Sequence, residues 1–275
     1  MKVKERATSE DLVMRKIKIV VPVATTAWNE LILEDMGRYK ATDTELAIVN
    51  IEKGPESIEC TYDVAWAELF TVQECEKAEA EGCDGVIIYC FGDPGLRAAK
   101  EKLNIPVVGI NEPAVHFASM LGNRFSIMAV GPDTVNRAML ADNVLLYGLE
   151  SRCASIRFLS MPVLEIEKQK DKQARRLFEE ATRAVEEDGA DTIILGCGSM
   201  FGVEEKVRNE LNVPVVVPGP VALKTCESLI KLDLTQSKRF FTAPPSKKKG
   251  HVGGDRWNRI EEYPSDVSKT RRYKI

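Results

Sequence analysis

The segment GCDGVIIYC (82–90) recurs, with conservative changes, as GADTIILGC (189–197). Each copy starts at a glycine, continues through a short apolar run and ends on a cysteine. Short apolar runs of this kind are typical of strands that are buried on both faces of a parallel sheet. The two copies therefore predict two equivalent buried strands, each with a thiol at its carboxyl end.

The similarity extends beyond these two segments. At an offset of about 108 residues, Ile19 aligns with Ile127 and Thr26 aligns with Thr134. The segment NIPV (104–107) likewise aligns with NVPV (212–215). A repeat of about 100 residues is too long for a solenoid unit. It predicts two copies of one α/β lobe, related by a pseudo-twofold axis.

Apolar runs rich in β-branched residues alternate with charged stretches that have helical apolar spacing. The expected strands cover 17–23, 45–51, 85–90 and 106–110 in the first copy, and 125–130, 154–161, 192–197 and 214–219 in the second. Strands that alternate with helices form parallel sheets with helices on their faces. We expect an α/β protein of two pseudo-symmetric lobes, each a mostly parallel four-stranded sheet flanked by helices. Its functional site should lie in the cleft between the lobes, where the strand ends meet.

The sequence divides into four parts on this interpretation. Residues 1–16 form an N-terminal extension, and residues 17–114 with 220–235 form lobe 1, which carries Cys90. Residues 115–219 form lobe 2, which carries Cys197. Residues 236–275 form a basic tail with 11 Lys and Arg against 4 Asp and Glu. We expect this tail to be flexible or to lie as an arm on a neighbouring subunit.

Composition excludes several classes of function. The 275 residues are 44% hydrophobic and 29% charged, as in ordinary globular proteins, and the net charge of −4 gives no reason to expect a nucleic-acid partner. No apolar run approaches the roughly 18 residues of a membrane span. The seven cysteines, without a secretory signal, predict free thiols in the cytoplasm. No C-x-x-C pair and only two histidines are present, so we expect no metal, and no nucleotide-binding motif points to a cofactor.

Cys90 and Cys197 are the candidate catalytic residues, because they are the cysteine pair that the repeat superposes. Each precedes a glycine-containing turn and a helical pattern, and a helix N-terminus lowers the pKa of a nearby thiol. Asp93 is the expected N-cap of the first of these helices, and the small residues Gly92, Gly198 and Ser199 leave room for backbone amides to approach a ligand. The other cysteines have no such partner, and we expect buried structural roles for Cys60, Cys75, Cys83, Cys153 and Cys226.

These segments resemble a known family. CFGDPGL (90–96) and GCGSM (196–200) look like the paired cysteine motifs of the aspartate/glutamate/hydantoin racemase superfamily, and the chain is most similar to its hydantoin racemase branch. GPESIECTYDVA (54–65) and GINEPAVHFASMLGNRFSIMAV (109–130) are also similar to that branch. The resemblance implies two pseudo-symmetric lobes, racemisation by two cysteines without a cofactor, and homo-oligomers. One departure concerns the first strand end, where the family's Asn-Pro-Asn is replaced by Val21-Pro22-Val23.

The resemblance implies that one thiolate removes a proton from a carbon next to a carbonyl while the facing thiol returns one. The resulting enolate needs amide donors near its oxygen. The candidate substrate-binding residues are Thr25, Thr26, Phe91, Gly92, Asp93, Asp133, Thr134, Gly198 and Ser199. The threonines are equally well explained as residues that begin helices. The expected substrate is a small molecule, namely a hydantoin, an amino acid or a related carbonyl compound.

Two alternatives remain open from the sequence. A relative of the same superfamily uses cysteine for covalent cis–trans isomerisation of an unsaturated dicarboxylate, as in maleate isomerases, and this chemistry also retains both thiols. A non-catalytic two-lobed binding protein would share the cleft but would have no use for paired thiols.

Overall fold

The computed structural model describes residues 14–131 and 133–245, and in its first lobe four parallel strands form one sheet. These strands are β1 (Arg15–Val21), β2 (Thr44–Asn50), β3 (Gly85–Ile88) and β4 (Val107–Gly109), in the order β2-β1-β3-β4. β1 begins two residues before the predicted start of lobe 1. Residues 1–13, which fall in the predicted N-terminal extension, lie outside the described residues.

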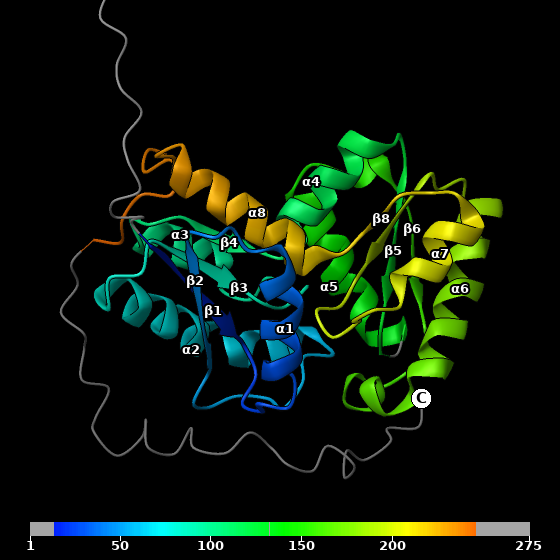
Figure 1. Cartoon of the computed structure of the whole chain (residues 1–275), viewed down its shortest axis with the longest axis horizontal. Coiled ribbons are helices and arrows are strands. Elements are labelled where there is room, and N and C mark those ends of the chain that lie inside the picture. The colour runs from blue at the N-terminus through cyan, green and yellow to red at the C-terminus, as the bar shows by residue number, and fades with distance from the viewer. Residues whose placement is uncertain (1–13, 132, 246–275) are drawn as a thin grey trace, which may run out of the picture.

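The second lobe repeats this arrangement. Its strands are β5 (Phe125–Ala129), β6 (Cys153–Phe158), β7 (Thr192–Leu195) and β8 (Val215–Val216), in the order β6-β5-β7-β8. All their pairings are parallel. The predicted α/β fold with two four-stranded sheets is therefore confirmed. Figure 1 shows the two sheets in separate halves of the molecule.

Helices flank both sheets. They are α1 (Asn29–Tyr39), α2 (Thr61–Ala80), α3 (Leu96–Lys102), α4 (Asn111–Leu121), α5 (Asp133–Leu146), α6 (Lys170–Glu186), α7 (Glu204–Leu211) and α8 (Pro218–Lys231). Short 3-10 helices cover Glu150–Arg152, Val163–Glu165 and Glu167–Gln169. None of the helices in the described part of the chain combines the length and the apolar character that a membrane span requires.

The apolar runs quoted first become the central strands. Every residue of β3 and of β7 is buried, because each strand has neighbours on both sides and helices on both faces. α6 shows how the helices meet the sheet: its polar face is exposed, while Leu177, Ala181 and Ala184 are fully buried on the other. Burial of these apolar side chains holds the helix layer against the sheet through the hydrophobic effect.

The last helix returns to the first lobe. α8 follows β8 of the second lobe but packs against α1, β3 and β4. The chain beyond α8 stays there, since the Gln236 side-chain amide donates to the carbonyls of Leu103 and Ile105, and its oxygen accepts from the Val107 N–H. Lys238 donates to the Lys100 carbonyl at 2.8 Å. The first residues of the predicted tail are thus attached to lobe 1, and residues 246–275 lie outside the described residues.

Candidate active site

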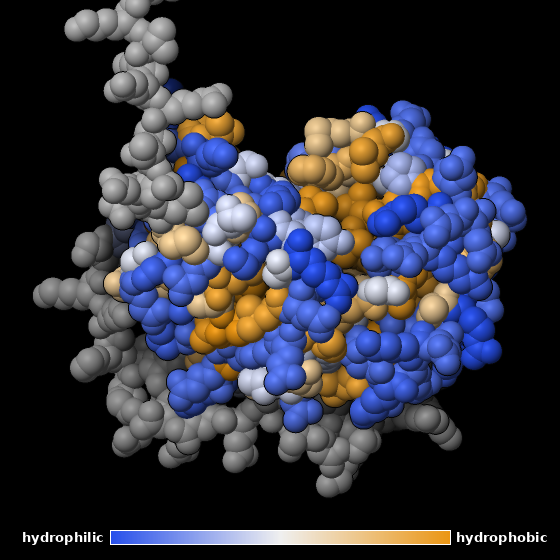
Figure 2. Space-filling model, in the orientation of Figure 1, coloured by the Kyte–Doolittle hydropathy of each residue, from blue (hydrophilic) through white to orange (hydrophobic). Residues whose placement is uncertain are grey.

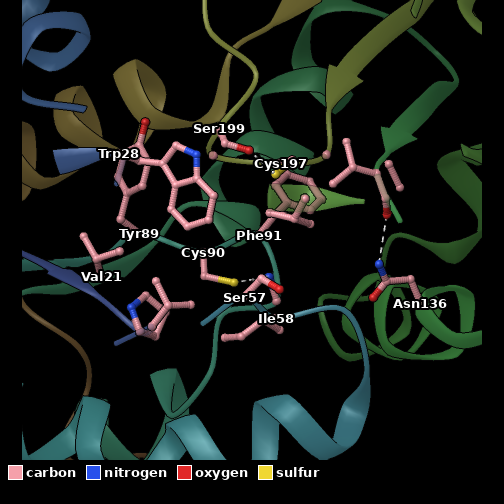
Figure 3. A pocket seen from close by; sticks show the side chains of 18 of the residues that line it. Val21, Trp28, Ser57, Ile58, Tyr89, Cys90, Phe91, Asn136, Cys197 and Ser199 are labelled. Atoms are coloured by element: carbon pink, nitrogen blue, oxygen red, sulfur yellow. Dashed lines mark hydrogen bonds between the residues drawn. The ribbon is translucent and has the colours of Figure 1, made fainter. Parts of the chain in front are cut away.

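A pocket lies where the carboxyl ends of β1, β3, β5 and β7 meet between the lobes, as expected for open α/β sheets. Apolar side chains make up most of its wall, and none of the described lining residues carries a charge. The lining residues are Val21, Pro22, Val23, Trp28, Ile32, Ser57, Ile58, Tyr89, Cys90, Phe91, Gly92, Ala129, Val130, Asn136, Met139, Leu140, Val163, Gly196, Cys197, Gly198 and Ser199. Figure 3 shows this pocket from close by.

The two predicted thiols both line the pocket. Cys90 follows β3 and Cys197 follows β7, each two residues beyond the strand end and each partly buried. In the view of Figure 3 they lie on opposite sides of the pocket. The Gly92 N–H donates to the Cys90 Sγ at 3.4 Å, and the Ser199 hydroxyl lies 3.0 Å from the Cys197 Sγ. Each thiol therefore has one polar partner from the turn that follows it.

The thiol pKa values move in the opposite direction from the one that the sequence predicts. Burial raises the pKa of Cys90 to about 12 and also raises the pKa of Cys197, while Gly92 and Ser199 act against this effect. Neither thiol is itself in the first turn of a helix, since α3 begins at Leu96 and α7 at Glu204. The apolar surroundings decide the direction, and these do not show in the local sequence.

Four of the predicted substrate-binding residues share the pocket wall with the thiols. They are Phe91 and Gly92 on the first lobe, and Gly198 and Ser199 on the second. The structure gives Gly198 a further role, because a Cβ there would lie 2.7 Å from the Tyr89 ring. The small residue at this position makes room for Tyr89 of the other lobe as well as for a ligand.

Asp93 lies outside the pocket, and its carboxylate binds groups of the surrounding protein. Its carboxylate accepts hydrogen bonds from the N–H groups of Asn111 and Glu112 and from the Tyr147 hydroxyl, at 2.6–3.1 Å. Burial raises its pKa to about 7, against the effect of these donors. The expected N-cap of the adjacent helix is thus wrong: Asp93 caps the distant helix α4, and Gly95 precedes α3.

Thr25, Thr26 and Asp133 are not among the described residues that line the pocket. The Thr25 Oγ1 accepts from the Ala27 N–H at 3.3 Å, and the exposed Thr26 accepts from the Asn29 N–H through its carbonyl. Asp133 is exposed in the first turn of α5 and pairs with Arg137 at 2.6 Å. Contacts of this kind are typical of residues that begin helices, which is the second explanation that the sequence offered for the threonines. The Thr134 side chain falls outside the described part of the chain.

Comparison with known proteins identifies the family. A model of the Asp/Glu/Hydantoin racemase family matches residues 17–226. The chain belongs to this family. It is 38% identical to a hydantoin racemase of Pseudomonas sp. strain NS671 over 86% of this chain and 94% of that protein. It is 35% identical to a hydantoin racemase of Paenarthrobacter aurescens over 85% of this chain and 98% of that protein.

A solved structure supports the same assignment. The allantoin racemase of Klebsiella pneumoniae is 34% identical and superposes with a TM-score of 0.80 over 85% of this chain and 95% of its own. Membership of the racemase family makes this chain an isomerase that acts on a small molecule. The family resemblance stated from the two cysteine motifs is confirmed.

Several lining residues of this racemase were not predicted as site residues. Ser57 and Ile58 lie in the segment 54–65 that already carried the family resemblance. Trp28 and Asn136 are 108 residues apart, so the repeat offset itself relates them. Tyr89 gave no local signal, because its importance comes from contacts with Gly198 and Gly219, which are distant in sequence.

Proposed function

We propose that this racemase-family chain interconverts the enantiomers of a hydantoin-type compound, with Cys90 and Cys197 as the two proton-transfer groups and no cofactor. One observation carries the proposal. The two thiols come from equivalent strand ends of the two lobes and line one pocket. Two groups placed in this way address opposite faces of a bound carbon, which racemisation without rotation of the substrate requires.

The proposed reaction conserves the protonation state of the pair. One thiolate takes the proton from the stereocentre to form an S–H bond, and the C–H electron pair moves onto the neighbouring carbonyl as an enolate. The facing thiol then gives its proton to the other face of the carbon and becomes a thiolate. The raised thiol pKa values make each thiolate a stronger base once it has formed, and they lower the fraction of thiolate at neutral pH.

The enolate oxygen requires hydrogen-bond donors in a fixed position. Residues 91–92 and 198–199 form the turns beside the two thiols, and their backbone N–H groups are the proposed donors. Cys197 has the better-stabilised thiolate of the pair, because the Ser199 hydroxyl lies 3.0 Å from its Sγ. We therefore assign the thiolate of the resting pair to Cys197 and the thiol to Cys90.

The pocket lining supports an uncharged ring as the substrate. None of the described lining residues is Lys, Arg or His, and burial of a carboxylate without a cation is costly. A free amino acid or an unsaturated dicarboxylate would bring one or two such groups. This argues against the covalent cis–trans isomerase. The names of the relatives, hydantoin racemase and allantoin racemase, agree with a ring or ureide substrate.

Deuterium exchange tests the proposal. Enantiopure 5-substituted hydantoins, allantoin, aspartate and glutamate are incubated in deuterated water, and NMR and polarimetry follow the stereocentre. Wild type should exchange and racemise a hydantoin, whereas Cys90→Ala and Cys197→Ala should not racemise it. Cys153→Ala is the matched control, because Cys153 is also partly buried but lies outside the pocket. Racemisation at wild-type rate in either pocket variant would remove that cysteine from the mechanism.

We also propose that the chain forms homo-oligomers and works in the cytoplasm. Phe117, Met120 and Leu121 on α4 expose apolar side chains, and Figure 2 shows hydrophobic surface over this helix. All seven cysteines are free, which fits a reducing compartment. Light scattering on a sizing column tests the first proposal, and a monomer at micromolar concentration would contradict it. Fractionation of the source cell tests the second.

A further inference from the structure

Asn136 is a polar group in an otherwise apolar part of the pocket wall. The residue is 4% exposed and lines the pocket. Its Nδ2 donates to the Val130 carbonyl at 2.9 Å, but its Oδ1 is buried without a partner among the described residues. A buried acceptor that receives no hydrogen bond raises the free energy of the folded protein, so a ligand that donates a hydrogen bond to this oxygen would be stabilised there.

The orientation of the Asn136 amide is fixed. The Val130 carbonyl accepts only, so Nδ2 must face it and Oδ1 must face away. Gly131 leaves room for the Asn136 amide in this position, because a Cβ at residue 131 would lie only 2.8 Å from the Asn136 Nδ2. Gly131 also has a φ of +83°, which favours glycine. The amide is therefore held by the backbone on one side and presents an acceptor on the other.

The two lobes differ at this position. The repeat offset that aligns Thr26 with Thr134 also aligns Trp28 with Asn136, and both line the pocket. In Figure 3 Trp28 and Asn136 lie at opposite sides of it. One lobe thus contributes a large apolar surface where the other contributes a hydrogen-bond acceptor. The pair breaks the pseudo-symmetry of the site, because an aromatic ring on one side faces a hydrogen-bond acceptor on the other.

We propose that Asn136 determines specificity by accepting, at its Oδ1, a hydrogen bond from a ring N–H of a cyclic ureide substrate. The inference rests on the proposed function and goes beyond it by naming the group that reads the ring. The ring lies toward Asn136, and the 5-substituent lies against Trp28. Carboxylates and esters carry no such N–H and leave the acceptor unpaired, so the site selects against them.

The test compares one 5-benzylhydantoin with its N1-methyl and N3-methyl derivatives. Wild type should bind one methyl derivative at least about tenfold more weakly than the parent, because the donor is lost. In Asn136→Leu, which keeps the side-chain volume but removes the acceptor, the parent should lose about tenfold and the discrimination should disappear. Calorimetry gives the affinities without any turnover, and racemisation rates are measured in parallel. The rejected derivative identifies the nitrogen that is read.

Asn111→Leu is the matched control. Asn111 is also buried, donates through Nδ2 to a backbone carbonyl and has an Oδ1 with no partner among the described residues, but it does not line the pocket. It should keep the discrimination between the parent and its derivatives. Equal discrimination in wild type and Asn136→Leu would overturn the role of Asn136, even if the hydantoin is racemised. Loss of racemisation with the discrimination intact would instead contradict only the proposed reaction. The wild-type ligand series decides the matter if Asn136→Leu does not fold, since equal affinity for all three ligands would also overturn it.

Discussion

At the scale of single residues, the contact between Ser199 and Cys197 sets how easily the pocket forms a thiolate. The Ser199 hydroxyl is 3.0 Å from the Cys197 Sγ and counteracts the rise of the thiol pKa that burial causes. A hydrogen bond to a charged group contributes about 1.5–3 kcal/mol. In the proposed mechanism, the amount of Cys197 thiolate at neutral pH therefore depends on Ser199 as well as on burial.

Ser199→Ala should raise the pKa of Cys197 further. The pH dependence of its alkylation by iodoacetamide, and that of kcat/KM, should move to higher pH by about 1 pH unit. Activity at pH 7 should fall about tenfold and recover in part at higher pH, because more thiolate forms there. Ser57→Ala is the control: Ser57 lines the same pocket, but its hydroxyl donates to Glu59 at 3.0 Å. An unshifted alkylation profile in Ser199→Ala would contradict the assignment.

At the scale of elements, the start of α8 fits against a side chain from β3's end. The Tyr89 ring occupies the space beside Gly219, where a Cβ would lie 2.6 Å from the Tyr89 Oη and 3.0 Å from its Cε2. Together with Gly198, this glycine lets an aromatic ring from the first lobe pack between the second lobe and the final helix. The contact joins three segments that are far apart in sequence.

Gly219→Ala should destabilise the protein by about 1–3 kcal/mol, because the added methyl overlaps the Tyr89 ring. The loss should be smaller in a Tyr89→Phe background, since the hydroxyl oxygen is the nearest atom. Urea unfolding measures both. Gly37→Ala in α1 is the control, because no described atom outside its own stretch of helix backbone lies within 4 Å of its Cβ position, and it should stabilise by about 0.5–1 kcal/mol. Equal effects at the two glycines would show that the Tyr89 contact is not the cause.

The fold, the position of the thiols and the turns beside them (91–92 and 198–199) could be predicted from local sequence, but the other residues of the site could not. The fully buried strands β3 and β7 have no polar face, so their apolar runs identify them, and the repeat places both cysteines at equivalent ends. Asp93 was assigned to the wrong helix because its partners lie 18 and 19 residues away. Thr and Asp are common both in binding sites and at the starts of helices, so the sequence around Thr25 and Asp133 does not distinguish the two roles.

At the scale of the whole molecule, the two lobes bring together carboxylates that repel each other. Asp35 on α1 and Glu204 on α7 each have a buried oxygen without a partner among the described residues. Burial and then the charge of Glu204 raise the pKa of Asp35; the charge of Arg38 lowers it, and the charge of Glu34 adds a smaller rise. The folded chain therefore holds the proton of Asp35 to higher pH than the unfolded chain does.

Stability should accordingly fall as pH rises above the ordinary range of an aspartate, because the unfolded state ionises first. Asp35→Asn removes this loss and should stabilise the protein at pH 7 by up to about 1 kcal/mol, since the side chain is only partly buried. The gain should vanish at pH 3. Glu34→Gln is the control on the same helix, as Glu34 is exposed and pairs with Arg38. Thermal unfolding from pH 3 to 8 measures the difference, and a gain that is independent of pH would exclude this cause.

The return of α8 to the first lobe has a consequence for the order of events on the ribosome. All four strands of the second sheet lie within residues 125–216. β3 and β4 of the first sheet, in contrast, pack against α8, which ends only at Lys231. A growing chain therefore has an incomplete N-terminal half until almost the whole described part has emerged. We expect the C-terminal lobe to reach its native packing first, which reverses the usual N-to-C order of domain folding during translation.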